Sequence, residues 1–274
     1  PTRATSLPFT ALAPPLLFAN TTLPHLLPSL QNLAHQRHWN SFELRGPSLS
    51  PPLTPSVQFY THELDLQPHP QIIDSHFSTS TRRAIRKSQK SPLQVEISQS
   101  KSALLQFYQL HELTRRHHGV PPQPLRFFLH IYEEILQQNL GWIVIAHHHR
   151  TPAAAAIFFL HHHHAIYKFG ASDRSLQHLH PNHLVFATAI HHLHQLHAHS
   201  LHFGRTSLHN EGLRRFKKSW GTTETIIDYS KFHLPTNSWI TSRDSSRGLH
   251  NSLFSHLPLP LNRLAGSLLY PHLD

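Results

Sequence analysis

Alternating and helical patterns of apolar residues divide the first part of the chain into short elements. The opening residues, PTRATSLPF, have the pattern of a strand, and a helix is predicted over 23–37. Strands follow at 41–46 and, after a proline-rich break at 51–55, at 57–66. This order of strand, helix and strand predicts a sheet with crossing helices.

The rest of the chain continues this mixed pattern through residue 230. Segment 73–90 is predicted as one helix, with Ser78 to Thr81 available as its N-cap and Ser91-Pro92 as its stop. Three apolar strands are predicted to form an antiparallel meander whose turns carry runs of histidine. A mixed-sheet fold of the α/β (α+β) class is therefore expected. The predicted elements are a strand at 93–97, a helix at 98–119 ended by Gly119, a helix from the Pro-rich 121–124 through 138, the meander strands 142–146, 153–160 and 165–170, a helix at 181–199, a strand at 200–204, a helix at 211–220 and a strand at 222–230.

The chain is strongly basic and has no cysteine. Lys and Arg number 24 against 14 Asp and Glu, which gives a formal net charge of +10. Such a charge favours polyanionic partners such as phosphates, nucleic acid or acidic lipid. The absence of Cys excludes disulfides, thiol nucleophiles and cysteine-ligated metals. No apolar run approaches the roughly 20 residues that span a bilayer, and no charged leader precedes one, so we expect a cytoplasmic protein.

The 31 histidines are the unusual feature of the composition, with runs at 147–149 and 161–164. Clustered imidazoles suggest metal binding. Both runs, however, fall where hairpin turns are predicted, and no acidic residue stands near enough to complete a site. We therefore expect no metal site and interpret the excess as composition at exposed positions, which gains positive charge near pH 6.

A face of one charge sign marks the predicted helix at 73–90. Arg82, Arg86 and Lys90 recur every four residues and share a face, with Arg83 and Lys87 beside them. Like charges at this spacing repel one another unless an anion lies opposite. Two interpretations stay open: a solvated basic helix, and a phosphate-binding face that uses Arg82 and Arg86.

The densest polar pattern is FGRTSLHNEGLRRFKKSWG at 203–221. A strand is predicted to end at Gly204, so Arg205, Thr206 and Ser207 are expected to lie in a loop. Asn210 is expected to cap a new helix, whose free N–H groups near Glu211 can hold an anion. Two stripes are predicted on this helix: a cationic one free to bind, made of Arg214, Lys217 and Lys218, and a buried one made of Leu213, Phe216 and Trp220.

A second pattern is the strand IYKFGASD at 166–173. Tyr167 and Phe169 are predicted to point to one side of the strand and Lys168 to the other. A lone charge in mid-sheet is either an edge or snorkelling residue or a contact to substrate. Asp173 at the strand end is a candidate general base, and an Asp after Ser is also a common N-cap or turn former.

Several of these segments together resemble the Fem-type aminoacyltransferases and their GNAT acetyltransferase relatives. Such proteins consist of two GNAT-like domains. The resemblance implies a partial first domain at 1–92 that lacks its opening strands and helices, a complete GNAT-like acyltransferase domain at 93–240, and a Leu/Pro-rich tail at 241–274. The segments that carry the resemblance, within 5–232, are SLPFT, FELRGP, TRRAIRKSQK, FYQLHELTRRHHGVPPQPLRFF, YKFGASD, PNHL and FGRTSLHNEGLRRFKKSWG.

The chain also departs from this family pattern. Relatives tend to have an Asp-Tyr-Gly-Gly-like turn after SLPFT, where this chain has ALAPP at 11–15, and acidic and amide positions in the last long helix are His here. The Gln/Arg-x-x-Gly-x-Gly loop by which ordinary GNAT enzymes hold the pyrophosphate of coenzyme A is missing. That absence favours aminoacyl-tRNA as the donor, and acyl-CoA stays open.

The resemblance implies transfer of an acyl or aminoacyl group to an amine of a cell-envelope peptide or saccharide precursor. An amine attacks the activated carbonyl, without a metal, a tightly bound cofactor or a covalent enzyme intermediate. The donor is acyl-CoA or aminoacyl-tRNA. Contact with tRNA, and peripheral contact with a membrane or lipid-linked precursor at the inner face of the membrane, are further partners to test.

The residue roles are hypotheses that accompany the resemblance. Arg205 and the N–H groups near Asn210 and Glu211 would bind substrate anions, Lys217 the phosphate-bearing leaving end of the donor, and Lys168 would orient the acceptor. Asp173 completes the predicted catalytic set of Lys168, Arg205 and Asp173. The predicted substrate-binding set is Arg82, Arg86, Thr206, Ser207, Asn210, Glu211, Lys217 and Trp220.

Two other functions stay open. A basic nucleic-acid-binding module fits the charge, but the chain has no recognised reader motif and no aromatics interleaved with its basic residues. An inactive GNAT-like scaffold is the other. The tail at 241–274 is expected to pack on the domain or, alternatively, to lie on a membrane as an interfacial helix.

Overall fold

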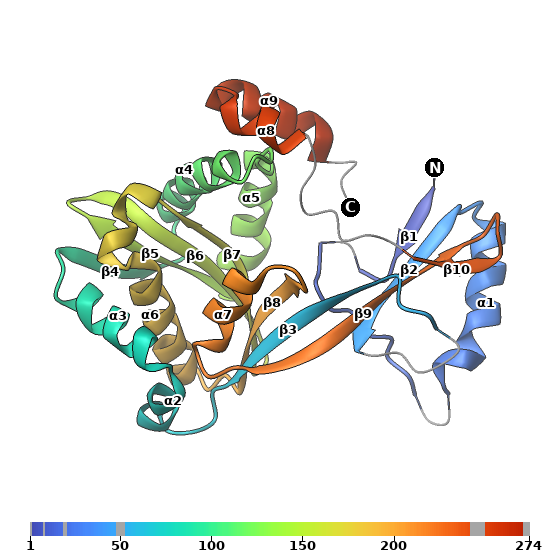
Figure 1. Cartoon of the computed structure of the whole chain (residues 1–274), viewed down its shortest axis with the longest axis horizontal. Coiled ribbons are helices and arrows are strands. Elements are labelled where there is room, and N and C mark those ends of the chain that lie inside the picture. The colour runs from blue at the N-terminus through green and yellow to red at the C-terminus, as the bar shows by residue number, and fades with distance from the viewer. Residues whose placement is uncertain (1, 8, 19–20, 48–52, 242–249, 271–274) are drawn as a thin grey trace. The chain divides into compact units, whose positions relative to one another are not determined.

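The computed structural model describes residues 2–7, 9–18, 21–47, 53–241 and 250–270 (Figure 1). The chain forms two compact units, each assembled from separate stretches of sequence. Unit 1 comprises Pro1–His62, Gly204–Arg214 and Glu224–Ser246, and unit 2 comprises Glu63–Phe203, Arg215–Thr223 and Arg247–Asp274. The domain boundaries at 92 and 240 stay a prediction. Parts of the proline-rich break and of the tail, at 51–52, 242–249 and 271–274, lie outside the described residues.

Strands and helices alternate along the chain, as the sequence predicts. The strands are β1 (Arg3–Thr5), β2 (Ser41–Pro47), β3 (Val57–Asp65), β4 (Leu93–Ser98), β5 (Gly141–His148), β6 (Thr151–His161), β7 (His164–Ser172), β8 (Ser200–Ser207), β9 (Thr223–His233) and β10 (Ser238–Ile240). The helices are α1 (Leu23–Gln36), α2 (Pro70–His76), α3 (Thr79–Gln89), α4 (Lys101–His117), α5 (Leu125–Ile131), the π-helical turn η1 (Tyr132–Leu136), the 3-10 helix η2 (Arg174–Leu179), α6 (Pro181–Gln195), α7 (Glu211–Lys218), α8 (His250–His256) and α9 (Leu259–Leu269).

Unit 2 contains the predicted meander. Its strands lie in the order β8-β7-β6-β5-β4, with antiparallel pairing from β4 through β7 and parallel pairing between β7 and β8. The first turn places His149 and Arg150 at φ of 47° and 67°, the left-handed region that a tight hairpin requires. His162 has φ of 51° in the second turn. The predicted meander with histidine at its turns is therefore confirmed.

The sheet of unit 2 has a hydrophobic core on each face. Val144, Ala146 and Phe158 pack with α6 in one core, whereas Ile143 and Ile157 pack with α4 and α5 in the other. Figure 1 shows α3 and α6 covering one face and α4 and α5 the other. Because alternate residues of a strand point to opposite faces, strands buried on both sides read as continuous apolar runs. The mixed α/β architecture expected from the sequence is confirmed.

A bulge in β7 changes the predicted orientation of its side chains. Phe158 pairs with Tyr167 and Ile157 pairs with Phe169, so Lys168 is an extra residue between the two pairs. Tyr167 therefore packs in the core on the α6 side and Phe169 in the core on the α4 side. The prediction that Tyr167 and Phe169 share a side is wrong, because the extra residue shifts the alternation by one.

The helix predicted over 73–90 is two helices, α2 and α3. Phe77 between them is extended, with φ of −66° and ψ of 140°, and its ring lies 5.0 Å from that of Trp220. Ser78 caps α3 by accepting from the Thr81 N–H, as predicted, and its own N–H donates to the Ser219 carbonyl at 2.8 Å. In a continuous helix the Ser78 N–H would bond a carbonyl of the preceding turn. Here it bonds Ser219, which is distant in sequence, and the helix is interrupted.

Unit 1 is organised around a second group of strands, in the order β1-β2-β9-β3, with β10 paired to β9. Its core holds Phe42 and Phe232, stacked at 5.2 Å, with Trp239 edge-on to both. The predicted strand at 1–9 is only three residues long, because β1 ends at Thr5 and residues 1 and 8 lie outside the described part.

The C-terminal helices α8 and α9 belong to unit 2. Arg263 of α9 forms an ion pair with Glu112 of α4, and the Asn251 side chain of α8 donates to the His118 carbonyl at 3.4 Å. These contacts confirm that the described part of the tail packs on the domain. Within the described ranges, the helices are too short or too polar to cross a bilayer.

Candidate active site

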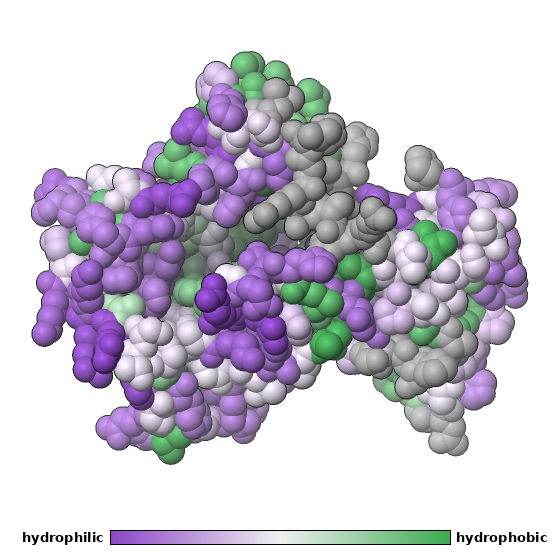
Figure 2. Space-filling model, viewed as in Figure 1, coloured by the Kyte–Doolittle hydropathy of each residue, from purple (hydrophilic) through white to green (hydrophobic). Residues whose placement is uncertain are grey.

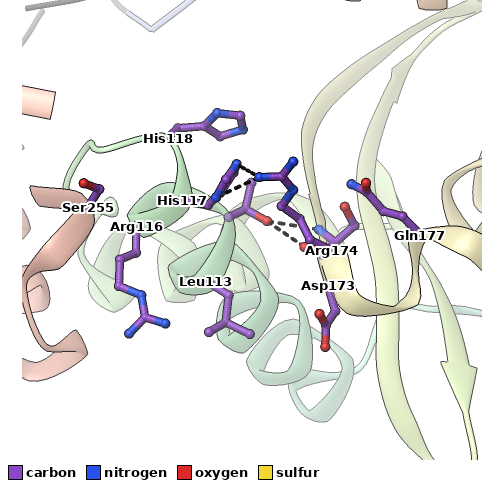
Figure 3. Close-up of a pocket in the computed structure, with 10 residues that line it drawn as sticks. Leu113, Arg116, His117, His118, Asp173, Arg174, Gln177 and Ser255 are labelled. Atoms are coloured by element: carbon purple, nitrogen blue, oxygen red, sulfur yellow. Dashed lines mark hydrogen bonds between the residues drawn. The ribbon is translucent and has the colours of Figure 1, made fainter. Parts of the chain in front are cut away.

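A pocket of about 560 Å³ opens at the end of β7 in unit 2 (Figure 3). The last two turns of α4 form one wall, the residues that follow β7 form another, and Ser255 of α8 closes part of the rim. The Ser172 N–H donates to Thr114 Oγ1 at 3.0 Å, and Thr114 Oγ1 donates back to the Ser172 carbonyl at 3.3 Å. These two hydrogen bonds fix the end of the strand against α4.

Asp173 lines this pocket where the chain leaves β7. Its Oδ1 accepts from the N–H and from the hydroxyl of Ser175, both at 2.8 Å, and so caps η2. The turn-forming interpretation of Asp173 is thereby confirmed. Its role as a general base stays a prediction.

The pocket is lined by several cationic or titratable side chains. Arg116 and His117 come from the last turn of α4, and Arg174 follows Asp173. Arg174 Nη1 lies 3.2 Å from His117 Nδ1 and also contacts Nε2. Because a guanidinium only donates, the imidazole nitrogen is the acceptor. The two arginines therefore give the pocket fixed positive charge.

His118 contributes a different property to the same wall. Burial lowers its pKa, and the nearby His117, Arg115 and Arg174 lower it further. The neutral imidazole is then the favoured form near pH 7. A neutral imidazole and the Asp173 carboxylate can each accept a proton, whereas Arg116 and Arg174 can hold an anion such as a phosphate.

Comparison with known proteins identifies the fold that contains this pocket. A family model described as an acetyltransferase (GNAT) domain matches residues 75–218, slightly more than half of the chain. The chain belongs to the GNAT acetyltransferase family. No curated protein matches it.

Solved structures similar to this GNAT protein include both Fem-type and tandem GNAT proteins. FemX has a TM-score of 0.59 and 15% identity, over 75% of this chain and 76% of that one. The L-PGS of Bacillus licheniformis has a TM-score of 0.55 and 11% identity, over 89% and 78% of the two chains. A tandem GNAT protein from the clavulanic acid biosynthesis pathway has a TM-score of 0.52 and 8% identity, over 77% and 69%. These similarities concern the fold, and they confirm the resemblance to Fem-type GNAT proteins at that level.

In this GNAT protein the pattern at 203–221 begins differently from the prediction. Strand β8 continues to Ser207, so Arg205, Thr206 and Ser207 lie in a strand and not in a loop. The prediction of a loop is wrong because Gly204 does not interrupt the strand. Arg205 is exposed, and its guanidinium lies over the rings of Phe59 at 4.7 Å and Tyr229 at 5.1 Å. Thr206 is buried.

The start of α7 agrees with the prediction. The Leu213 N–H donates to Asn210 Oδ1 at 3.1 Å, which confirms Asn210 as the cap. Glu211 binds Arg214 Nη1 at 3.2 Å, and Arg214 also forms two hydrogen bonds, of 2.8 and 2.9 Å, with Glu224. The Asn210 amide oxygen thus already accepts from one N–H at the helix start proposed for substrate anions, and Glu211 adds a negative charge there.

The far end of α7 belongs to the core of unit 2. Trp220 is fully buried beside Phe186, as predicted. Lys217 is only 3% exposed, so its predicted place on a freely accessible stripe is wrong. Residues three apart share a helical face, which puts Lys217 on the same side as Trp220. Burial lowers the pKa of Lys217 to about 7.

The remaining predicted residues lie on other elements of unit 2. Lys168 Nζ is 5.9 Å from the ring centroid of Phe169, and Arg82 Nη1 donates to the Ser75 carbonyl at 3.0 Å. Arg86 is exposed on α3. Of the predicted catalytic residues, Asp173 is the one that lines the pocket described here.

Four basic or titratable lining residues were not predicted as site residues from the sequence: Arg116, His117, His118 and Arg174. The available signal was the basic run TRRHHG at the end of the predicted helix 98–119, together with the Arg that follows Asp173. That signal says which side chains are cationic but not that the two segments meet.

Proposed function

We propose that this chain is an N-acyltransferase that moves an acyl or aminoacyl group onto an amine of a cell-envelope peptide or saccharide precursor. The cationic pocket at the end of β7, inside the region of the GNAT family match, carries the proposal. The resemblance to Fem-type proteins supports the class of acceptor. The donor is acyl-CoA or aminoacyl-tRNA, and both carry phosphates.

The reaction needs an anion site and a proton acceptor side by side. The amine lone pair attacks the acyl carbonyl carbon, a C–N bond forms, and the bond from that carbon to the donor sulfur or oxygen breaks. The amine loses one proton, and the leaving thiolate or alkoxide takes one up. Asp173 and neutral His118 are the proposed proton acceptors because both line the pocket.

Arg116 and Arg174 are proposed to hold the phosphate-bearing part of the donor. A guanidinium binds a phosphate through paired hydrogen bonds, and two guanidinium groups lining one pocket suit a diphosphate or a nucleic-acid backbone. Loss of one such contact costs on the order of 3 kcal/mol in the barrier, which is roughly a hundredfold in rate.

The roles predicted for Lys217, Lys168 and Arg205 are hypotheses separate from this pocket, because none of the three is among its described lining residues. Turnover near the wild-type rate in Arg205→Ala and Lys217→Ala would remove those two assignments.

A donor screen tests the proposal. Purified protein is incubated with acyl-CoA or with aminoacyl-tRNA and a panel of amines, and the modified amines are identified by mass analysis. Arg174→Ala should lower kcat/KM about a hundredfold with the productive donor. Arg126→Ala, which removes an exposed arginine of α5, is the matched control and should leave the rate unchanged. Equal rates in the two variants would contradict the assignment of the pocket.

A polyanion-binding face is the second candidate function, and α3 supports it. Arg83, Arg86, Lys87 and Lys90 are all exposed there. Such a face fits tRNA as donor, and it also fits a nucleic-acid-binding module without catalysis. Binding of tRNA that Arg86→Glu weakens, with no turnover of either donor, would favour the module or an inactive scaffold over the enzyme.

A further inference from the structure

Helix α9 presents its apolar side outward. Leu261, Leu264 and Leu268, at spacings of three and four, are 52%, 57% and 64% exposed. The two buried residues of the helix are Asn262 and Gly266. A surface helix normally buries its apolar stripe and exposes its polar one, so this orientation is the reverse of the one that water alone would favour.

The polar side of α9 is held by specific contacts. Arg263 forms the ion pair with buried Glu112, and Asn262 Nδ2 donates to the Phe254 carbonyl at 3.3 Å. The backbone at Gly266 comes so close to the Pro122 carbonyl that a Cβ there would overlap it. These contacts prevent the helix from rotating about its axis to bury the leucines.

The leucine face continues into a groove. Between α9 and the pair α4 and α5 lies a cavity of about 570 Å³, whose lining includes Leu105, Tyr108, Leu125 and Leu264. Figure 2 shows hydrophobic atoms gathered over the C-terminal helices at the top of the view. A contiguous apolar surface of this kind on a folded domain marks a binding surface.

We propose that the leucine face of α9, defined as Leu261, Leu264 and Leu268, docks on a lipid surface that contains anionic lipid. The net charge of the chain favours an anionic lipid surface over a second copy of the chain as the binding partner. The chain carries a net charge of +10, so two copies repel each other whereas an anionic bilayer attracts the chain.

A cationic side chain lies close to α8. Arg116, in the last turn of α4, lines the same pocket as Ser255 of α8. A helix that buries leucines in the lipid interface while nearby arginines reach the headgroups binds through both forces. This inference concerns binding and not turnover, so vesicle binding tests it separately from the proposed acyl transfer.

Vesicle sedimentation tests the docking surface. The full chain is mixed with phosphatidylcholine vesicles, with or without phosphatidylglycerol, and the bound fraction is measured. Binding is expected only with phosphatidylglycerol. The triple variant Leu261→Ser/Leu264→Ser/Leu268→Ser should weaken it about tenfold or more, because three partly buried leucine contacts are lost. The matched control, Ile72→Ser/Ile97→Ser/Leu140→Ser, removes three exposed apolar side chains of α2, β4 and the turn before β5 and should bind as the wild type does.

A second measurement leaves the leucine face almost intact. The chain has no Cys, so Leu268→Cys creates a unique site for an environment-sensitive fluorophore. Its emission should rise and shift to the blue with anionic vesicles, whereas the same label at Leu140→Cys should not respond. Absence of that response, equal vesicle binding by the triple variant and the control, or a dimer in sedimentation velocity that the triple variant abolishes would each overturn the proposal.

Discussion

The pairing of Glu112 with Arg263 sets the attachment of the C-terminal helices, and its loss has a calculable cost. Glu112 is 1% exposed in α4, whereas the Arg263 side chain is 53% exposed on α9. Arg263 Nη2 lies 2.6 Å from Glu112 Oε2, and Nε contacts Oε1, so the pair is bidentate. Burial and then Glu112 raise the pKa of the neighbouring Tyr108 to about 12. Glu112 is thus buried beside Tyr108, and Arg263 supplies its cationic partner.

Arg263→Ala should destabilise the attachment of α9 by about 2 to 3 kcal/mol. Breaking a fully buried pair typically costs about 3 to 5 kcal/mol, because the remaining charge is left uncompensated. Water reaches half of this guanidinium, so the lower end of the range applies. Opening of the C-terminal helices should then increase about 30- to 160-fold.

The double variant Glu112→Gln/Arg263→Ala separates charge from packing. It replaces the buried carboxylate by a neutral amide and should recover at least about 1 kcal/mol relative to Arg263→Ala alone. Amide hydrogen exchange across α4 and α9 measures the local opening, and urea unfolding measures the whole domain, with Arg126→Ala as the control. If Arg263→Ala matches the control within about 0.5 kcal/mol, or if the double variant is the less stable of the two, the charge argument fails.

Three other predictions rest on buried groups. The pKa of Lys217 falls to about 7 on burial, so the folded protein binds fewer protons than the unfolded chain between about pH 7 and 10.5. Stability to urea should therefore rise with pH across that window, and Lys217→Met should remove the rise and add about 4 kcal/mol at pH 7. Burial lowers the pKa of His111 to about 3. Because the unfolded chain takes up that proton below pH 6.5, stability should fall on acidification. The slope of the unfolding free energy against pH reports the number of protons taken up on unfolding, and His111→Phe should lower that number by about one between pH 6 and 4. Gly266→Ala places a Cβ against the Pro122 carbonyl, and it should cost about 1 to 3 kcal/mol and speed amide exchange in α9.

Local signals in the sequence predicted most elements correctly. The caps Ser78 and Asn210 accept the hydrogen bonds that their residue types suggest, and the meander has its turns at the histidine runs. Each of these features depends on residues close together in the chain. Apolar alternation and cap chemistry act over a few residues, so a single sequence carries the information.

The errors all involve partners distant in sequence. The Ser78 N–H bonds the Ser219 carbonyl, which interrupts a helix that local pattern would continue. The sequence places Lys217 on a cationic stripe, whereas in the structure it is buried in the core beside Trp220. The pocket was not predicted for the same reason. Thr114 and Ser172 are 58 residues apart, and neither segment contains a pattern that indicates contact with the other.

The bulge at Lys168 connects the largest of these errors to the candidate site. Before it, the odd-numbered residues Ala165 and Tyr167 face the α6 side, and after it, the odd-numbered Phe169 and Ala171 face the α4 side. The continued alternation brings Asp173 out on the α4 side, where the pocket lies. A regular strand would direct the same carboxylate toward α6, away from Arg116 and His118. Deleting Lys168 should therefore remove Asp173 from the pocket while leaving its side chain and sequence neighbours unchanged. Lys168→Ala is the control because Lys168 is itself a predicted catalytic residue, and equal turnover in the two variants would contradict a role for the position of that carboxylate.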